Sequence, residues 1–82
     1  MEKRIGSIII LVKDKENIHQ LNDILTHHAS IIVGRQGIPL RERSLSIISL
    51  ITEGTVNEIN ALTGQLGKLR GITARATLVK EQ

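Results

Sequence analysis

Three histidines, His19, His27 and His28, are the residues of this 82-residue chain that most readily suggest metal chemistry. Their spacing argues against it. In a helix, His19 and His27 would point the same way but lie about 12 Å apart along the axis, while His27 and His28 would diverge. The chain has no cysteine, which removes thiolate ligands, thiolate nucleophiles and disulfides. We therefore interpret the histidines as surface or helix-capping residues and expect no metal and no cofactor.

A better candidate for a binding site is a run of glycine, glutamine and arginine residues near the middle of the chain. Its members are Gly34, Arg35, Gln36, Gly37, Arg41 and Arg43. Glycine inside a strand often marks a bulge or the close approach of another molecule, and a guanidinium group suits anions. One hypothesis is that Arg35 and Arg41 contribute to an anion site at a subunit interface. The alternative is a bulged edge strand whose charge protects it from aggregation.

The sequence contains no recognisable set of catalytic residues. The spacing reveals no Ser/His/Asp set and no pair of carboxylates, and the loop at 13–17 lacks the glycines of an acylphosphatase-type phosphate cradle. An RNA-binding sheet of similar size would stack bases on aromatic side chains, but the aromatic content is 0%. We therefore expect a protein that is not an enzyme and does not bind nucleic acid directly.

Composition places the chain among small single-domain proteins, so residues 1–82 are expected to form one domain. The formal net charge is +3 and the sequence pI about 9.8. The basic residues are scattered among acidic ones, which is typical of a solvated surface. No apolar run approaches the roughly 20 residues of a membrane span. The absence of cysteine favours a cytoplasmic protein.

Hydrophobic periodicity predicts four strands and two helices. The strands are expected at 5–12, 31–38, 45–52 and 72–79, with polar turns at 39–44 and 53–54. One helix should follow Asn17, capped by that residue with Gln20 as its partner. The other should follow Thr55, which forms a T-x-x-E capping box with Glu58.

Three glycines lie in the second predicted helix or just after it, and their presence there needs an explanation. Gly64 and Gly67 lie inside the predicted helix, where each should cost about 1 kcal/mol relative to alanine. Close packing of another element against them would offset that cost. Gly71 is placed where a helix would end in a left-handed residue.

The resulting order, βαββαβ, predicts an α+β, ferredoxin-like sandwich with a four-stranded antiparallel sheet in the order 4-1-3-2. Two helices can cover only one face of that sheet. The strands at 5–12 and 45–52, expected at its centre, are apolar on both faces. Because a large exposed apolar patch usually marks an interaction surface, we predict self-association or burial against another protein.

Several longer segments resemble a known family. They are the G-R-x-G-I-P-x-R-E-R run at Gly34 to Arg43, the strand S-I-I-S-L-I and the E-I-N-A-L-T-G-x-L-G segment at Glu58 to Gly67. Together they resemble the small ACT-like regulators associated with iron-only hydrogenase systems. The wider resemblance is to ACT domains and to the C-terminal domain of the nickel-responsive repressor NikR.

This resemblance implies a regulatory oligomer that binds a small effector at subunit interfaces, without catalysis. The effector-binding residues do not transfer, since the loop at 13–17 has no glycine and the chain has no cysteine for a nickel site. No DNA-binding element precedes the first strand, which also argues against direct operator binding. We expect a homodimer or homotetramer formed through the sheet face and edge strands, with a small anionic effector or a protein partner and no membrane contact. The alternative is a structural assembly module with no small-molecule ligand.

Overall fold

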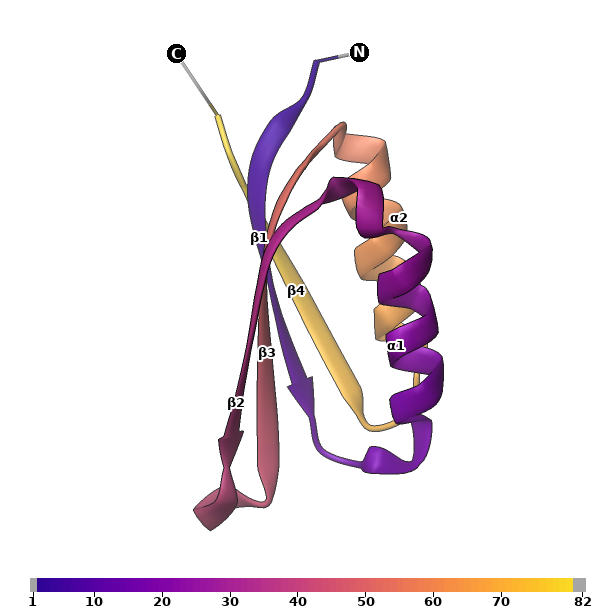
Figure 1. Ribbon diagram of the computed structural model, residues 1–82, viewed down its shortest axis with the longest axis vertical. Helices are drawn as coiled ribbons and strands as arrows, with labels where there is room; N and C mark the ends of the chain where they lie inside the picture. The colour runs from indigo at the N-terminus through magenta and orange to yellow at the C-terminus, as the bar shows by residue number, and fades with distance from the viewer. Residues whose placement is uncertain (1, 81–82) are drawn as a thin grey trace.

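A four-stranded antiparallel sheet forms one layer of the molecule, and two helices cover one of its faces (Figure 1). The computed structural model describes residues 2–80. Its strands are β1 Arg4–Val12, β2 Ile32–Leu40, β3 Leu45–Gly54 and β4 Ile72–Val79, and its α-helices are α1 Ile18–His27 and α2 Val56–Gly67. Three short 3-10 helices, η1 Lys15–Asn17, η2 Ala29–Ile31 and η3 Arg41–Arg43, lie in the connections.

The strands lie side by side in the order β2-β3-β1-β4, which reads 4-1-3-2 from the opposite edge. Strands β1 and β3 are central and run antiparallel, with Val12 opposite Ser46 at one end and Arg4 opposite Gly54 at the other. Strands β4 and β2 are the edges. Both central strands are apolar on both faces, although the helices cover only one of them (Figure 1).

The core between sheet and helices is aliphatic, as the lack of aromatic residues requires. Alternate residues of β1 and β3 point toward the helices because the side chains of a strand alternate between its two faces. The helices contribute the residues of one stripe each. The fully buried side chains are Ile8, Ile10, Leu21, Leu50, Ile59, Leu62, Leu66 and Thr52.

Helix α2 begins at the capping box that the sequence predicted. The Glu58 amide donates to Thr55 Oγ1 at 3.1 Å, and the Thr55 amide donates to Glu58 Oε1 at 2.8 Å. The first helix follows Asn17 as predicted, but its predicted cap was wrong, since the Asn17 side chain makes no capping hydrogen bond. Asp14 caps the preceding η1 turn instead, and Asn17 Nδ2 donates across the loop to the Arg70 carbonyl at 3.1 Å.

The hairpin strands extend further than the sequence predicted. Pro39 and Leu40 belong to β2, where an edge position tolerates a residue without an N–H group. Glu53 and Gly54 continue β3 and do not form a turn, because Ile5 and Arg4 of β1 lie opposite them as pairing partners. Ile31, expected in the second strand, lies in η2.

Gly71 has the predicted left-handed backbone, with φ at 78°. The interpretation of the two helical glycines as packing contacts was wrong. A Cβ atom added at Gly64 or Gly67 would meet nothing within 4 Å, and both residues are exposed. Within residues 2–80, no element approaches them to offset their cost to the helix.

Candidate functional site

The sheet face opposite the helices is uncovered and largely apolar. Figure 1 shows both helices on the same side of the sheet and none on the other. The strand register places three aliphatic side chains in one row across this face, from Ile38 on β2 through Ile47 on β3 to Leu11 on β1. Neighbouring strands are about 4.8 Å apart, so these side chains form a continuous surface.

The same face carries most of the exposed large hydrophobic residues of the described chain. The members that are at least 40% exposed are Ile5, Ile9, Ile38, Ile51 and Val79. Polar residues lie between them, with Gln36, Ser49 and Arg75 in the same row as Ile9. We call this surface, formed by the outward residues of β1 to β4, the open face.

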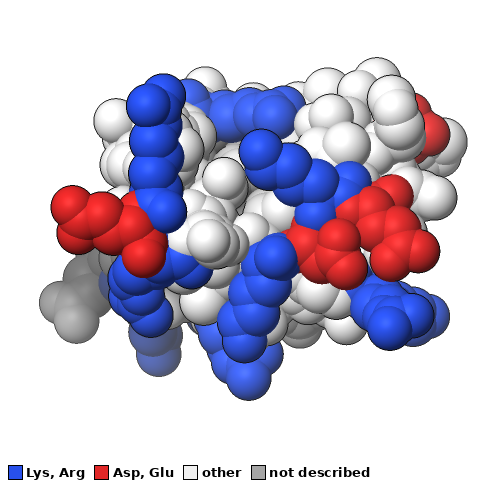
Figure 2. Space-filling view, turned by 90° about the horizontal axis from the view of Figure 1, so that it is seen from below, with Lys and Arg blue, Asp and Glu red and all other residues white. Residues whose placement is uncertain are grey.

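One end of the molecule is basic. The β1–α1 connection, the β2–β3 hairpin tip and the α2–β4 connection meet at this end, which is the lower end of Figure 1. It carries six Lys or Arg side chains, namely Lys13, Lys15, Arg41, Arg43, Lys68 and Arg70, and three acidic ones, Asp14, Glu16 and Glu42. The excess of three equals the formal net charge of the chain, +3. Figure 2 looks onto this end and shows Lys and Arg side chains, with groups of acidic side chains among them, around a small uncharged area.

A groove of about 570 Å³ opens at the basic end, between the β1–α1 connection and the hairpin tip. Two charged segments flank it, residues 13–15 on one side and Arg41 on the other. Apolar and hydroxyl side chains complete the lining, which comprises Val12, Pro39, Leu40, Ser44, Leu45 and Ser46. The volume lies within the range of about 300–1,000 Å³ that small-molecule sites occupy.

A bulge at Val33 decides where the residues of the predicted glycine-arginine site point. Ile32 lies opposite Thr52, but Gly34 lies opposite Ile51, so Val33 is left over. The extra residue exchanges the two faces for the rest of β2. Arg35 therefore lies opposite the buried Leu50, on the helix side.

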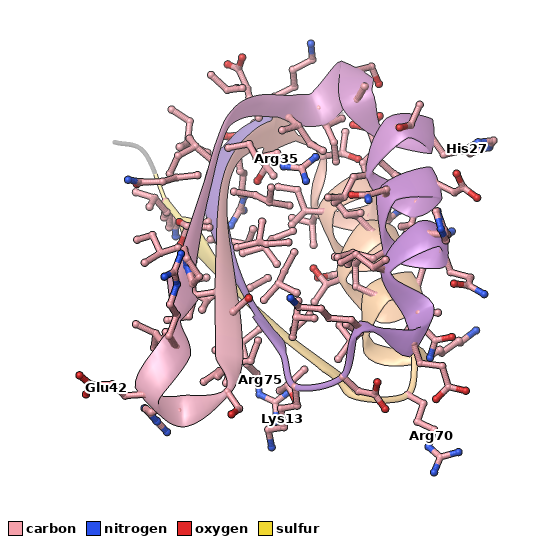
Figure 3. All side chains as sticks on the ribbon, turned by 60° about the horizontal axis from the view of Figure 1, so that its bottom comes forward. Lys13, His27, Arg35, Glu42, Arg70 and Arg75 are labelled. Atoms are coloured by element: carbon pink, nitrogen blue, oxygen red, sulfur yellow. The ribbon has the colours of Figure 1, made fainter. Side chains whose placement is uncertain are left out.

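The six predicted site residues consequently do not form one cluster within the chain. Gly34 and Gln36 belong to the open face, whereas Arg35 and Gly37 belong to the helix side. Arg35 Nη2 donates to Asn22 Oδ1 of α1 at 3.3 Å, and Figure 3 shows its side chain pointing toward the helices.

Arg41 and Arg43 lie in η3 at the hairpin tip. Six residues of extended chain put Arg41 about 20 Å from Arg35. Figure 3 shows the neighbouring Glu42 at that tip, far from Arg35. A shared site for Arg35 and Arg41 would need a second subunit, and that hypothesis stays a prediction.

The histidines lie on α1 or at its end. His28 Nε2 is 3.2 Å from Gln65 Oε1 of α2, and the rings of His27 and His28 are 6.2 Å apart. Within residues 2–80, no three His, Cys, Asp or Glu side chains are grouped so that they could hold a metal ion.

The comparison with known families decides where the chain belongs. The family described as TM1266-like, iron-only hydrogenase system regulator, matches residues 4–76. The chain belongs to this family. Its similarity to the structure of the uncharacterized protein TM1266 from Thermotoga maritima agrees, with 34% identity over 96% of this chain and 100% of that one, at a TM-score of 0.91.

A second solved structure shares the fold with this TM1266-like chain at much lower identity. It is an unknown protein from Galdieria sulphuraria, with a TM-score of 0.64 and 10% identity. The alignment covers 99% of this chain and 48% of that one. A search of the curated proteins finds no match. Neither helix of this TM1266-like chain, over the part that the structure describes, has the length and apolar character needed to cross a membrane.

Sequence reasoning missed Lys13 and Lys15 of this TM1266-like chain as residues that line the groove. In the sequence, their segment is notable only as a loop without glycine. The signal was present in the topology, because antiparallel pairing of β1 with β3 puts Val12 opposite Ser46. The residues after β1 must then lie beside the hairpin tip.

Proposed function

We propose that this chain is a non-catalytic regulatory domain of an iron-only hydrogenase system, acting as a homo-oligomer that senses a small effector. Family membership supports the regulatory role. The element order β1-α1-β2-β3-α2-β4 supports a ferredoxin-like, ACT-like arrangement. The domain would act in the cytoplasm and would leave DNA contact to another protein.

The open face is the observation that carries the proposal of self-association. Five aliphatic side chains on it are at least 40% exposed, although β1 and β3 fully bury residues on the opposite face. The Cα atoms extend 40 Å along the strands and 16 Å across them. With side chains added, such a face approaches the roughly 800 Å² that each partner of a standard interface buries. A homodimer or homotetramer would cover it, with help from the edge strands.

A structural assembly module without a ligand is the second candidate. The open face alone would serve such a module, since docking needs no effector. The groove at the basic end favours sensing, because its volume of about 570 Å³ and its cationic rim suit a small anionic ligand. An assembly module would not need such a groove. Effector binding would shift the equilibrium between oligomeric states only if the ligand binds one state more tightly than another.

The test is the solution mass of wild type and of Ile9→Glu, by light scattering on a sizing column at several concentrations. Ile9 is 43% exposed at the centre of the open face, so a glutamate at this position stays in contact with water when the chain is a monomer. We expect a dimer or tetramer for the wild type and a monomer for the variant, because an unpaired charge in an apolar interface is costly.

Ala61→Glu on the exposed side of α2 is the matched control, since it adds the same charge away from the open face. Its mass should equal that of the wild type. A wild type that remains monomeric at every concentration would overturn self-association and leave the open face for a different protein.

A further inference from the structure

The groove at the basic end combines an apolar floor with a cationic rim. Pro39, Leu40 and Leu45 provide the accessible apolar surface, above the buried Val12. A ligand with an apolar body gains from removing this surface from water, at about 25 cal/mol per Å² buried. A wholly polar ion would leave the floor unused.

Three cations surround that floor from two separate segments. Lys13 and Lys15 come from the β1–α1 connection, and Arg41 comes from η3. All three are exposed, so their charges are available to a ligand. Asp14 is the one acidic residue of the lining, and its Oδ1 already accepts the Glu16 amide at 2.9 Å.

Two hydroxyl groups add uncharged donors. Ser44 and Ser46 both line the groove, on the same side as Arg41. Ser44 has a left-handed backbone, with φ at 49°, which closes the hairpin tip. A guanidinium fork, two ammonium groups and hydroxyl donors suit a phosphate, whose oxygens accept several charge-assisted hydrogen bonds.

The walls of the groove are held in place by pairing within the fold. Val12 lies opposite Ser46, and Leu40 lies opposite Leu45. The Lys13 amide donates to the Gly71 carbonyl at 2.8 Å, which ties the β1–α1 connection to the α2–β4 connection. Little ordering of the backbone is then left for a ligand to induce, which favours affinity.

From these features we infer that the groove binds a small organic phosphate monoester. Its phosphate would lie between Lys13, Lys15 and Arg41, and its apolar body would lie on Pro39, Leu40 and Leu45. A dianion matches three cations better than a carboxylate does. This inference deepens the proposed effector-sensing function and rests on it for its biological purpose, but not for the binding itself.

The test is a titration of uniformly ¹⁵N-labelled protein, followed by amide chemical shifts. The probes are phenyl phosphate, inorganic phosphate and benzoate. We expect phenyl phosphate to give saturable shifts in residues 12–15 and 40–46, with an affinity about tenfold higher than either of the other probes. Equal affinity for inorganic phosphate would exclude a role for the apolar floor, and equal affinity for benzoate would overturn the phosphate assignment.

Two double variants separate a local site from the general field of the basic end. Lys13→Ala/Lys15→Ala removes two rim cations, and Lys68→Ala/Arg70→Ala removes two cations from the same end outside the groove. The first pair should weaken phenyl phosphate binding about tenfold or more and the second less than about twofold. Similar losses in both would show a diffuse attraction and contradict the site. Arg41→Gln provides a second rim variant, also expected to weaken binding, should the first pair not fold.

Light scattering on the same samples keeps this inference separate from the proposed oligomer. An oligomer that gives no phenyl phosphate shifts would refute the groove but keep self-association. A monomer with saturable shifts would refute self-association and keep the groove.

Discussion

Arg35 Nη2 donates to Asn22 Oδ1 at 3.3 Å, which connects edge strand β2 to helix α1. The contact exists because the bulge at Val33 turns Arg35 toward the helices. With regular pairing from Ile32 onward, Arg35 would lie opposite Ser49 and face the open side. A single extra residue therefore determines which surface receives this charge.

Replacing Arg35 with alanine should lower the free energy of unfolding by less than about 1 kcal/mol, because the hydrogen bond is exposed to solvent. The oligomeric mass should not change, because the side chain points away from the open face. Urea unfolding followed by circular dichroism suits a chain without aromatic residues, and light scattering gives the mass.

A double-mutant cycle with Asn22→Ala provides the control. If the two side chains act only on each other, the double variant should lose about as much stability as either single variant. A change of mass in Arg35→Ala would contradict this placement and support the interface hypothesis for this arginine.

Gly71→Ala should be much more damaging. Gly71 has φ at 78°, and a Cβ atom there would come within 2.5 Å of Asp14 Cβ. The left-handed backbone alone costs a residue with a side chain about 1–2 kcal/mol, and the clash would displace the β1–α1 connection. We expect a loss of at least about 1–2 kcal/mol in urea unfolding.

Gly64→Ala is the matched substitution, with the opposite sign expected. Gly64 is helical, exposed and free of neighbours within 4 Å. Alanine should stabilise the fold by roughly 0.5–1 kcal/mol, because glycine loses more conformational entropy in a helix. A destabilised Gly64→Ala variant would indicate that a subunit contact covers this part of α2.

The elements with a strong hydrophobic period could be predicted from the sequence. The short apolar runs of β1 and β3 and the helical stripes of α1 and α2 are visible in the sequence, because apolar residues gather where an element is buried. The Thr55–Glu58 cap was also predictable, since both partners lie within one turn. The ends of β2 and β3 were not, because Glu53 stays in a strand only when Ile5 of β1 pairs with it.

The candidate site was less predictable for the same reason. Which face Arg35 occupies depends on the bulge at Val33, and nothing in the residue types fixes the bulge at that position rather than at Gly34 or Gly37. Lys13 and Arg41 come from segments nearly thirty residues apart that only the paired strands bring together.

The capping box of α2 should make stability depend on pH in the acidic range. The Thr55 amide, and after it the Thr55 hydroxyl, hydrogen-bond to the Glu58 carboxylate and hold its pKa below the usual range, with a further contribution from Lys3. Because the folded-state pKa is lowered, the stabilisation is present above the ordinary glutamate value of about 4.3 and is lost as the pH falls below it. Wild type should therefore melt at a lower temperature at pH 3 than at pH 5.

Glu58→Gln isolates this contribution. The variant keeps an acceptor for the Thr55 amide but cannot titrate. Its melting temperature should therefore fall less than that of the wild type between pH 5 and pH 3, an interval that contains the ordinary glutamate pKa of about 4.3. Glu42→Gln at the hairpin tip removes the same charge without a capping contact and should follow the wild type. If Glu58→Gln and the wild type fall in parallel, the acid sensitivity originates elsewhere and the cap acts through hydrogen-bond geometry alone.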